Sequence, residues 1–200
     1  PKYPTLHLFE CANCRSFSFD SDTPIDVAKL YTHDYFHGDE YKNYLSHRAV
    51  HERNFKKKWE ILKPFLSETP RVLEVGCAYG FFTDYILRHG AEKAFGIDIS
   101  EDAIQSAIRT FGPRFAVSTD NFRPPFSYNA LVAWDAWEHF PEPLTQFKGW
   151  SDGLEPGGIF ALTTVDSESL NARFRGAKWR MIHPPTHLHY PGKNALKHGL

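Results

Sequence analysis

The stretch RVLEVGCAYGFFTDYILRHGAEKAFGIDIS, Arg71–Ser100, decides the fold. An apolar, β-branched run ends at Gly76, and a short loop with a second glycine, Gly80, leads into a helical pattern that stops at Gly90. A second predicted strand follows and ends in Asp98. A strand, a glycine-bearing turn, a helix and a strand closed by an acidic residue make a βαβ unit typical of proteins that bind an adenosine-type cofactor.

The composition is that of an ordinary globular protein. The chain has 200 residues and a formal net charge of −1, which gives no electrostatic footprint for nucleic acid or a membrane surface. No apolar run approaches the ~20 residues that span a bilayer. Three cysteines do not make a disulfide framework in a chain of this length, so we expect a cytoplasmic protein. The sequence leaves the oligomeric state open.

Two segments differ in pattern, with a predicted boundary between residues 39 and 40. Residues 1–39 form an N-terminal extension with a C-x-x-C pair and a Tyr-rich segment, and residues 40–200 form the main domain. The main domain begins with a helical pattern from Glu40 to Leu66. Beyond Ser100, a predicted helix N-cap, strands at 114–117, 130–134 and 159–164 alternate with helical segments, and a turn at 155–158 precedes the last strand. This order predicts an α/β fold with a doubly wound, mostly parallel sheet and an N-terminal helical cap.

Acidic residues stand at or near the ends of four predicted strands: Glu74, Asp98, Asp120 and Asp135. The ligand of such a sheet binds at the carboxyl ends of its strands, so we expect these residues near one site.

The first loop narrows the choice of cofactor. Gly76-Cys77-Ala78-Tyr79-Gly80 has the spacing G-x-x-x-G, and Ala78 stands where a dinucleotide fold has the glycine that admits a pyrophosphate. Glu74 would repel a pyrophosphate but can pair with an ammonium group. Asp98 can accept hydrogen bonds from both hydroxyls of a ribose. A plain strand–turn–helix, with glycines placed for geometry, is the alternative for the loop alone.

The pattern E-x-G-x-x-x-G resembles the first motif of class I S-adenosylmethionine-dependent methyltransferases. Asp120 with Asn121 stands where that family has a residue that meets the adenine amino group. The segment ALVAWDAWEHFPEP resembles the family's fourth motif in a branch with the pattern D-x-x-E-H-x-x-x-P, and AKWRMIHPPTHLHYP resembles the W…H-L-x-Y-F element of quinone and sugar methyltransferases. The resemblance covers roughly Glu40 to Tyr190 and implies a Rossmann-like methyltransferase fold.

The resemblance also implies methyl transfer to a small-molecule partner, with a hydroxyl group as the expected acceptor. It implies a cofactor, S-adenosyl-L-methionine, and a set of residues that hold it. These are Glu74, Gly76, Cys77, Ala78, Tyr79, Gly80, Asp98, Ile99, Asp120, Asn121, Trp134 and Asp135. Trp134 is more commonly a core residue, which is the alternative for its role.

Methyl transfer is an in-line displacement at a sulfonium, and a hydroxyl nucleophile also needs a base. His139, just beyond the fourth strand, is the candidate base, with a helix-capping or loop-bracing role as the alternative. Glu138 could assist it or bind a divalent metal, but two adjacent residues are a weak metal signal, so no metal site is predicted. His187 and His189, spaced i, i+2, are candidates on the substrate side, with surface placement as the alternative.

The N-terminal extension offers two further features. Tyr35 is a substrate-side candidate, since the Tyr-rich segment resembles one that folds over the cofactor, although it could simply pack on the sheet. Cys11 and Cys14 supply two of the four ligands of a zinc site, so we expect a truncated or vestigial knuckle.

The C-terminus departs from the family pattern. Only 36 residues follow Thr164, whereas a class I sheet normally finishes with two further strands. We expect either a fragment that lacks these strands or a minimal domain.

Two other functions stay open. One is a partner subunit that binds the cofactor without catalysis, which the missing strands favour. The other is an NAD-binding oxidoreductase, which Glu74 and the loop spacing disfavour.

Overall fold

The computed structural model describes residues 6–21, 26–31, 48–118 and 122–199. The chain divides into two compact units that interleave along the sequence. We call Tyr31–Trp134 with Gly149–Leu162 the sheet unit, and Pro1–Leu30 with Asp135–Lys148 and Thr163–Leu200 the terminal unit. The predicted domain boundary at residues 39 and 40 lies outside the described residues and stays a prediction.

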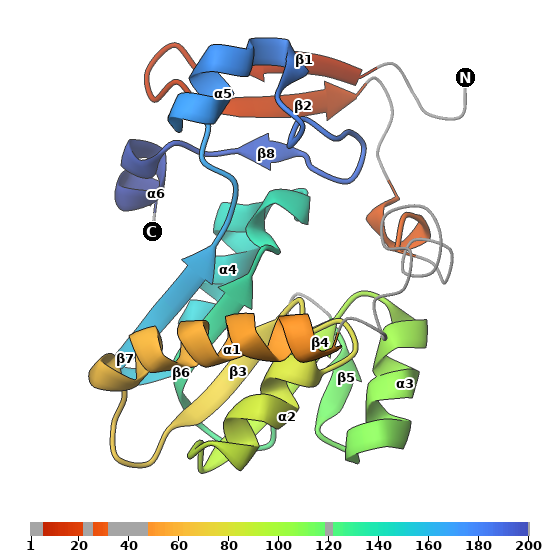
Figure 1. Cartoon of the computed structure of the whole chain (residues 1–200), viewed down its shortest axis with the longest axis vertical. Coiled ribbons are helices and arrows are strands. Elements are labelled where there is room, and N and C mark those ends of the chain that lie inside the picture. The colour runs from red at the N-terminus through yellow and green to blue at the C-terminus, as the bar shows by residue number, and fades with distance from the viewer. Residues whose placement is uncertain (1–5, 22–25, 32–47, 119–121, 200) are drawn as a thin grey trace. The chain divides into compact units, whose positions relative to one another are not determined.

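A five-stranded sheet forms the centre of the sheet unit (Figure 1), and it confirms the predicted α/β class. Strand β3 (Arg71–Val75) pairs in parallel with β4 (Lys93–Asp98) and β6 (Tyr128–Trp134), and β4 pairs in parallel with β5 (Phe115–Val117). With β7 (Leu154–Thr163) at the other edge, the order is β5-β4-β3-β6-β7. Val72, Leu73 and Val75 are fully buried, as expected for a central parallel strand covered on both faces.

Helices α1 (Arg48–Leu62) and α2 (Phe81–Arg88) share one apolar core with the central strands. The core is anchored by Trp59, whose indole Nε1 donates a hydrogen bond to the carbonyl of His89 at 2.9 Å. A short 3₁₀ turn, η4 (Lys63–Phe65), follows α1 and contains Pro64, which cannot continue an α-helix. Helix α3 (Glu101–Phe111) packs through Ile104 in a second core beside β5.

Local signals in the sequence place several helix ends. The Ser100 hydroxyl accepts a hydrogen bond from the amide of Ala103, so Ser100 caps α3 as predicted. Gly112 ends α3, with φ +89 and its amide bonded to the carbonyl of Ile108. Helix α1 begins at Arg48, and the predicted start near Glu40 falls in residues that the structure does not describe.

The last strand of the sheet unit begins earlier than predicted. The sequence predicts a turn at 155–158 and a strand at 159–164, whereas β7 already starts at Leu154. Glu155 is held by Arg71 of β3, with a guanidinium-to-carboxylate distance of 2.5 Å. At Gly158, a Cβ would meet the carbonyl oxygen of Asn129 at 3.1 Å, so this glycine permits a close approach to the start of β6. Gly158 thus serves a contact between strands, whereas Gly157 keeps a left-handed φ of +79 within β7.

The terminal unit contains a second, three-stranded sheet. Strands β1 (Leu6–Glu10) and β2 (Phe17–Ser21) form an antiparallel hairpin, and β8 (His189–Tyr190) pairs antiparallel with β2. Its other elements are η1 (Val27–Lys29), η5 (Trp137–His139), most of α4 (Pro143–Ser151), α5 (Leu170–Arg175), η6 (Gly176–Lys178) and α6 (Lys193–Gly199). The only described strand after β7 therefore joins the N-terminal hairpin and does not extend the five-stranded sheet.

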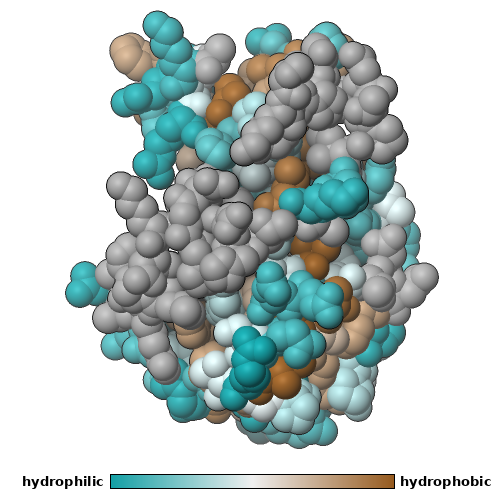
Figure 2. Space-filling model, turned by 90° about the vertical axis from the view of Figure 1, so that its right-hand side faces the viewer, coloured by the Kyte–Doolittle hydropathy of each residue, from teal (hydrophilic) through white to brown (hydrophobic). Residues whose placement is uncertain are grey.

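Among the described helices, none has the length and apolar character needed to cross a bilayer. Figure 2 shows one face of the molecule, on which brown hydrophobic areas lie between hydrophilic ones among the described residues.

Candidate functional site

The loop between β3 and α2 has an unusual backbone. Gly76, Ala78 and Gly80 all adopt left-handed conformations, with φ of +76, +46 and +74. Such values are natural for glycine and cost a residue with a Cβ about 1 kcal/mol or more. The amides of Gly76 and Cys77 donate to the carbonyl of Ile97 at 2.8 and 3.0 Å, which fastens the loop to the end of β4. The alternating backbone forms a fixed turn at the carboxyl end of β3.

Asp98 links this loop to the next helix. Its Oδ2 accepts a hydrogen bond from the amide of Ala78 at 2.7 Å, and its Oδ1 accepts one from the amide of Ser100 at 2.9 Å. The side chain is 9% exposed, and burial raises the pKa of its carboxyl above the ordinary value, although these amide bonds oppose the shift. The two bonds fix the carboxylate at the carboxyl ends of β3 and β4, and a carboxylate has acceptor capacity beyond them.

Glu74 lies beneath the same loop. The side chain is 4% exposed, and the hydroxyl of Thr83 in α2 donates a hydrogen bond to its Oε2. Burial raises the pKa of Glu74 from 4.5 to about 8, against the opposing effects of the Thr83 hydrogen bond and the positive charge of Lys58. Glu74 is therefore mostly protonated at pH 7, and a cation beside it would favour its ionised form.

Close packing under the loop explains one glycine that the sequence did not single out. A Cβ on Gly96 would lie 2.8 Å from the sulfur of Cys77 and 2.8 Å from a ring carbon of Phe115. Gly80 meets the same ring, with a Cβ contact of 2.4 Å. Cys77 is buried, and burial raises the pKa of its thiol, so it acts as a small packing residue here. Only the close fit of loop, β4 and β5 reveals these requirements.

The other predicted cofactor residues of the sheet unit differ in exposure. Tyr79 is buried next to the Phe81 ring, with ring centroids 6.3 Å apart, and Ile99 is 37% exposed. Trp134 is half-buried at the end of β6, edge-on to Phe82 and with the ammonium group of Lys58 5.0 Å from its ring centroid. Asp120 and Asn121 lie outside the described residues, as does Tyr35. Their roles stay predictions.

Asp135 follows Trp134 directly and belongs to the terminal unit. It has φ +53, its amide donates to the carbonyl of Thr163 at 2.8 Å, and its Oδ1 accepts from the Thr163 hydroxyl at 2.9 Å. The left-handed backbone turns the chain sharply after β6 and leads into η5. Its predicted contact with a cofactor is untested.

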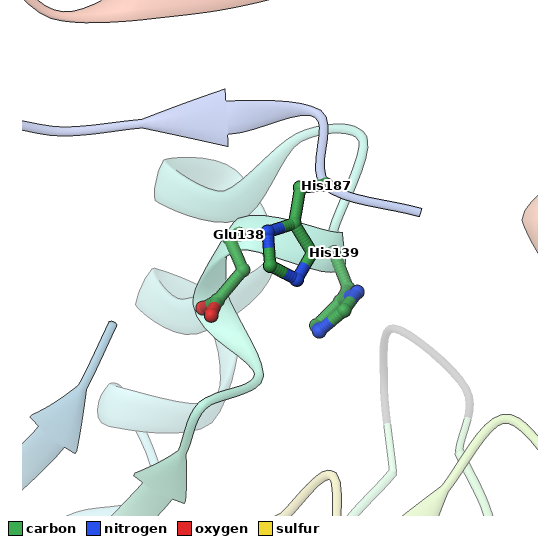
Figure 3. Close-up of side chains that lie close together, drawn as sticks. All are labelled: Glu138, His139 and His187. Atoms are coloured by element: carbon green, nitrogen blue, oxygen red, sulfur yellow. The ribbon is translucent and has the colours of Figure 1, made fainter. Parts of the chain in front are cut away.

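The terminal unit contains a cluster of three side chains, Glu138, His139 and His187, drawn in Figure 3. Each side chain offers one candidate ligand atom, and these atoms all lie within 4.8 Å of one another. Glu138 and His139 come from η5, and His187 comes from the segment just before β8. The segments are joined by a hydrogen bond of 2.7 Å from the Leu188 amide to the Glu138 carbonyl. The structure thus brings His139 and His187 together, although the sequence separates them by 48 positions.

His139 is held by the backbone. Its Nδ1 lies 2.8 Å from the carbonyl oxygen of Thr186, so Nδ1 carries the proton and donates it, and the lone pair lies on Nε2. Burial of the ring and the neighbouring His187 ring lower the pKa of His139 to about 4, whereas the Thr186 carbonyl opposes this shift. The ring is therefore neutral at pH 7.

His189 has different hydrogen-bond partners from His187, whose Nδ1 lies 2.8 Å from the Met181 carbonyl. The Nδ1 of His189 lies 3.1 Å from the Ser18 hydroxyl, and its Nε2 lies 3.1 Å from the Pro141 carbonyl. Both nitrogens are engaged in bracing β8, and the predicted substrate role stays untested.

Cys11 and Cys14 lie in the turn between β1 and β2. The amide of Cys11 donates to the carbonyl of Ser16 at 2.9 Å, and Arg15 has φ +61. Backbone hydrogen bonds from Cys14 and Asn13 lower the pKa of the exposed Cys11 thiol. Within the described part of the chain no third metal ligand joins the pair, and the predicted partial knuckle is untested.

A family model described as a methyltransferase domain matches residues 43–200. The chain belongs to this methyltransferase family. The match covers most of the chain and confirms the predicted resemblance to methyltransferases, which rests on the loop and the residues at the strand ends. It does not test the D-x-x-E-H pattern.

The names of two relatives of this methyltransferase domain refer to small molecules, trans-aconitate and ubiquinone. A trans-aconitate 2-methyltransferase from Afipia carboxidovorans is 28% identical over 103 residues, which are 50% of this chain and 40% of that protein. A ubiquinone biosynthesis O-methyltransferase from Paraburkholderia phymatum is 26% identical over 153 residues, 70% of this chain and 65% of that protein. The chain therefore spans less than two thirds of the length of both relatives.

Solved structures share the fold of this methyltransferase domain. An S-adenosylmethionine-dependent methyltransferase from Mesorhizobium loti superposes with a TM-score of 0.56 at 20% identity, over 72% of this chain and 78% of that one. The magnesium protoporphyrin IX methyltransferase from Synechocystis, solved with bound S-adenosylhomocysteine, gives 0.59 at 16% identity, over 82% and 78%. At these identities the similarity shows the fold, and it agrees with the predicted Rossmann-like methyltransferase architecture.

Proposed function

We propose that this chain binds S-adenosyl-L-methionine and transfers its methyl group to a hydroxyl oxygen of a small-molecule acceptor. The observation that carries the proposal is the β3–α2 loop with three left-handed residues, bonded through the Ala78 amide to the Asp98 carboxylate. Family membership and the printed names of the relatives support the reaction class, and one of those names specifies an O-methyltransferase.

Each part of the cofactor has a matching group in the sheet unit. The backbone of loop 76–80 can come close to the amino acid moiety of the cofactor, which carries no phosphate group for Glu74 to repel. Glu74 supplies a carboxyl that the ammonium group would ionise, directly or through water. Asp98, held in place by two amides, would accept hydrogen bonds from the ribose hydroxyls. Ile99 and Trp134 offer apolar surface for the adenine ring.

The transfer step is an in-line displacement, for which an enzyme chiefly aligns the reactants and excludes water. We propose that His139 assists loss of the acceptor proton. The hydrogen bond from its Nδ1 to the Thr186 carbonyl supports this role, because it fixes the ring and directs the lone pair to Nε2.

Isothermal titration calorimetry with S-adenosylhomocysteine, S-adenosylmethionine and NAD tests the cofactor assignment. We expect one molecule of either sulfur nucleotide to bind per chain and NAD to show no binding. Asp98→Ala should abolish binding, and Asp102→Ala, which removes an exposed carboxylate four residues further on, should leave it intact. Absence of binding by both sulfur nucleotides would sink the proposal.

Turnover separates an enzyme from a non-catalytic cofactor-binding subunit. Formation of S-adenosylhomocysteine is measured with a panel of phenolic, sugar and carboxylic acceptors. We expect acceptor-dependent formation that His139→Ala reduces, whereas a purely binding subunit gives none with any acceptor.

A further inference from the structure

We propose that Glu138, His139 and His187 form a binding site for a divalent first-row metal ion of the zinc class, such as Zn²⁺ or Co²⁺. The three side chains lie in the terminal unit and bring one carboxylate and two imidazoles together, with candidate ligand atoms within 4.8 Å of one another (Figure 3). Neither the family description nor the names of the two sequence relatives refer to a metal.

The two rings are oriented by the backbone in the way that metal-binding histidines usually are. The Nδ1 atom of His139 donates to the Thr186 carbonyl at 2.8 Å, and that of His187 donates to the Met181 carbonyl at 2.8 Å. In each ring this bond fixes the tautomer with its lone pair on Nε2, the form in which a neutral imidazole binds a metal.

The carboxylate has an outer partner as well. Glu138 is 2% exposed, and its Oε2 accepts a hydrogen bond from the hydroxyl of Thr164 at 2.8 Å. All three candidate ligands are thus held by a second layer of hydrogen bonds, which metal sites use to orient their ligands.

Hydrogen bonds to the backbone join the two segments that carry these ligands, η5 and the segment just before β8. The Leu188 amide bonds to the Glu138 carbonyl, and the Thr186 and Met181 carbonyls come from the same C-terminal segment as His187. Ligand atoms about 2.1 Å from a tetrahedral ion are ~3.4 Å apart, so side-chain movements on the order of 1 Å would close the cluster onto an ion.

The ligand types select the kind of metal. Two imidazoles and one carboxylate suit Zn²⁺, Co²⁺ or Fe²⁺, whereas Mg²⁺ and Ca²⁺ prefer oxygen ligands alone. Three protein ligands are also the number found in catalytic zinc sites, where a fourth position stays open to water or substrate. His189 does not fit such a site, because both of its nitrogens are engaged with Ser18 and Pro141.

With an ion bound, the Nε2 lone pair of His139 would hold the metal and would not take the acceptor proton itself, and this consequence rests on the proposed function. A hydroxyl oxygen in the open position would have a lowered pKa and would release its proton to solvent water. The oxygen lone pair would then attack the methyl carbon, the bond between carbon and sulfur would break, and its electron pair would stay on sulfur. The products are the methyl ether and S-adenosylhomocysteine.

The test is a Co²⁺ titration of the full chain, stripped of metal with a chelator and carrying no affinity tag. Cys11→Ser and Cys14→Ser are introduced first, so that neither thiol contributes a cobalt signal. We expect one Co²⁺ per chain, visible absorption bands of a four- or five-coordinate ion, no thiolate-to-cobalt bands, and displacement by Zn²⁺.

Variants locate the site. His187→Ala and Glu138→Gln should each weaken Co²⁺ binding about a hundredfold or more, and His189→Ala should leave it within about threefold of the parent protein. Binding of S-adenosylhomocysteine to each variant shows that the sheet unit is folded. A parent protein that binds no Co²⁺, or variants at 187 and 138 that bind as the parent does, would overturn the metal site. Failure of the nucleotide to bind, with cobalt binding intact, would instead count against the proposed function.

Discussion

Replacing Glu74 with glutamine should make the protein more stable, by an amount that grows with pH. Burial raises the pKa of Glu74 from 4.5 to about 8 in the folded protein. Between these two values the folded chain binds one proton more than the unfolded chain at this residue. The free energy of unfolding of the wild type therefore falls by ~1.4 kcal/mol per pH unit from this group alone, and it levels off above about pH 8.

The variant lacks this loss because an amide does not ionise in that range. A glutamine at 74 also keeps an oxygen that can accept the hydrogen bond from Thr83. The difference in the free energy of unfolding, variant minus wild type, should rise by about 3 kcal/mol between pH 5 and pH 7. For a chain of this size that corresponds to a relative shift in Tm of roughly 6–12 °C.

The assay is guanidinium unfolding followed by circular dichroism at half-unit steps from pH 5 to pH 8. The matched control is Glu68→Gln, which changes an exposed carboxylate before β3. Its difference from the wild type should stay flat over the same range. A flat difference for Glu74→Gln would refute the argument, because it would mean that Glu74 ionises equally in the folded and unfolded chains.

Three further predictions concern the loop and the cluster. Asp98→Asn should weaken S-adenosylhomocysteine binding about 10- to 100-fold by calorimetry, because it removes a charged hydrogen-bond acceptor; an unchanged Kd would mean that Asp98 does not meet the nucleotide. Gly96→Ala should lower the free energy of unfolding by about 1–3 kcal/mol in denaturant titration, because the new methyl group meets Cys77 and Phe115; a change below about 0.5 kcal/mol would contradict this packing. His139→Ala should reduce turnover about 100-fold or more while S-adenosylhomocysteine affinity stays within about threefold; unchanged turnover would remove His139 from the reaction.

The central sheet could be predicted because its signals are local. Apolar β-branched runs identify β3 and β4, and Ser100 marks the start of α3 by its capping hydroxyl. The loop spacing and the acidic strand ends then indicated the family, which the family match confirms. These features depend on residues a few positions apart.

The terminal unit could not be predicted in the same way. β8 pairs with β2 across 171 positions, and no local pattern in either segment specifies that pairing. The contact between His139 and His187 follows from the same long-range folding, although the sequence makes each of them a candidate by itself, His139 by its place after the fourth strand and His187 by its i, i+2 spacing from His189. The sequence also predicted a turn at 155–158, where contacts of Glu155 with β3 and of Gly158 with β6 place the chain in β7 instead.

Gly96 and Thr83 illustrate a second limit. Gly96 is required by the closeness of Cys77 and Phe115, and Thr83 matters as the partner of Glu74. Both roles come from side chains of different elements that meet only in the folded chain.

A crystal structure of the chain with S-adenosylhomocysteine tests the central claim most directly. We predict that the ribose hydroxyls lie within hydrogen-bond distance of the Asp98 carboxylate, that the amino acid moiety lies against loop 76–80, and that the ammonium group lies near Glu74. A nucleotide bound away from Asp98 and this loop would contradict the account.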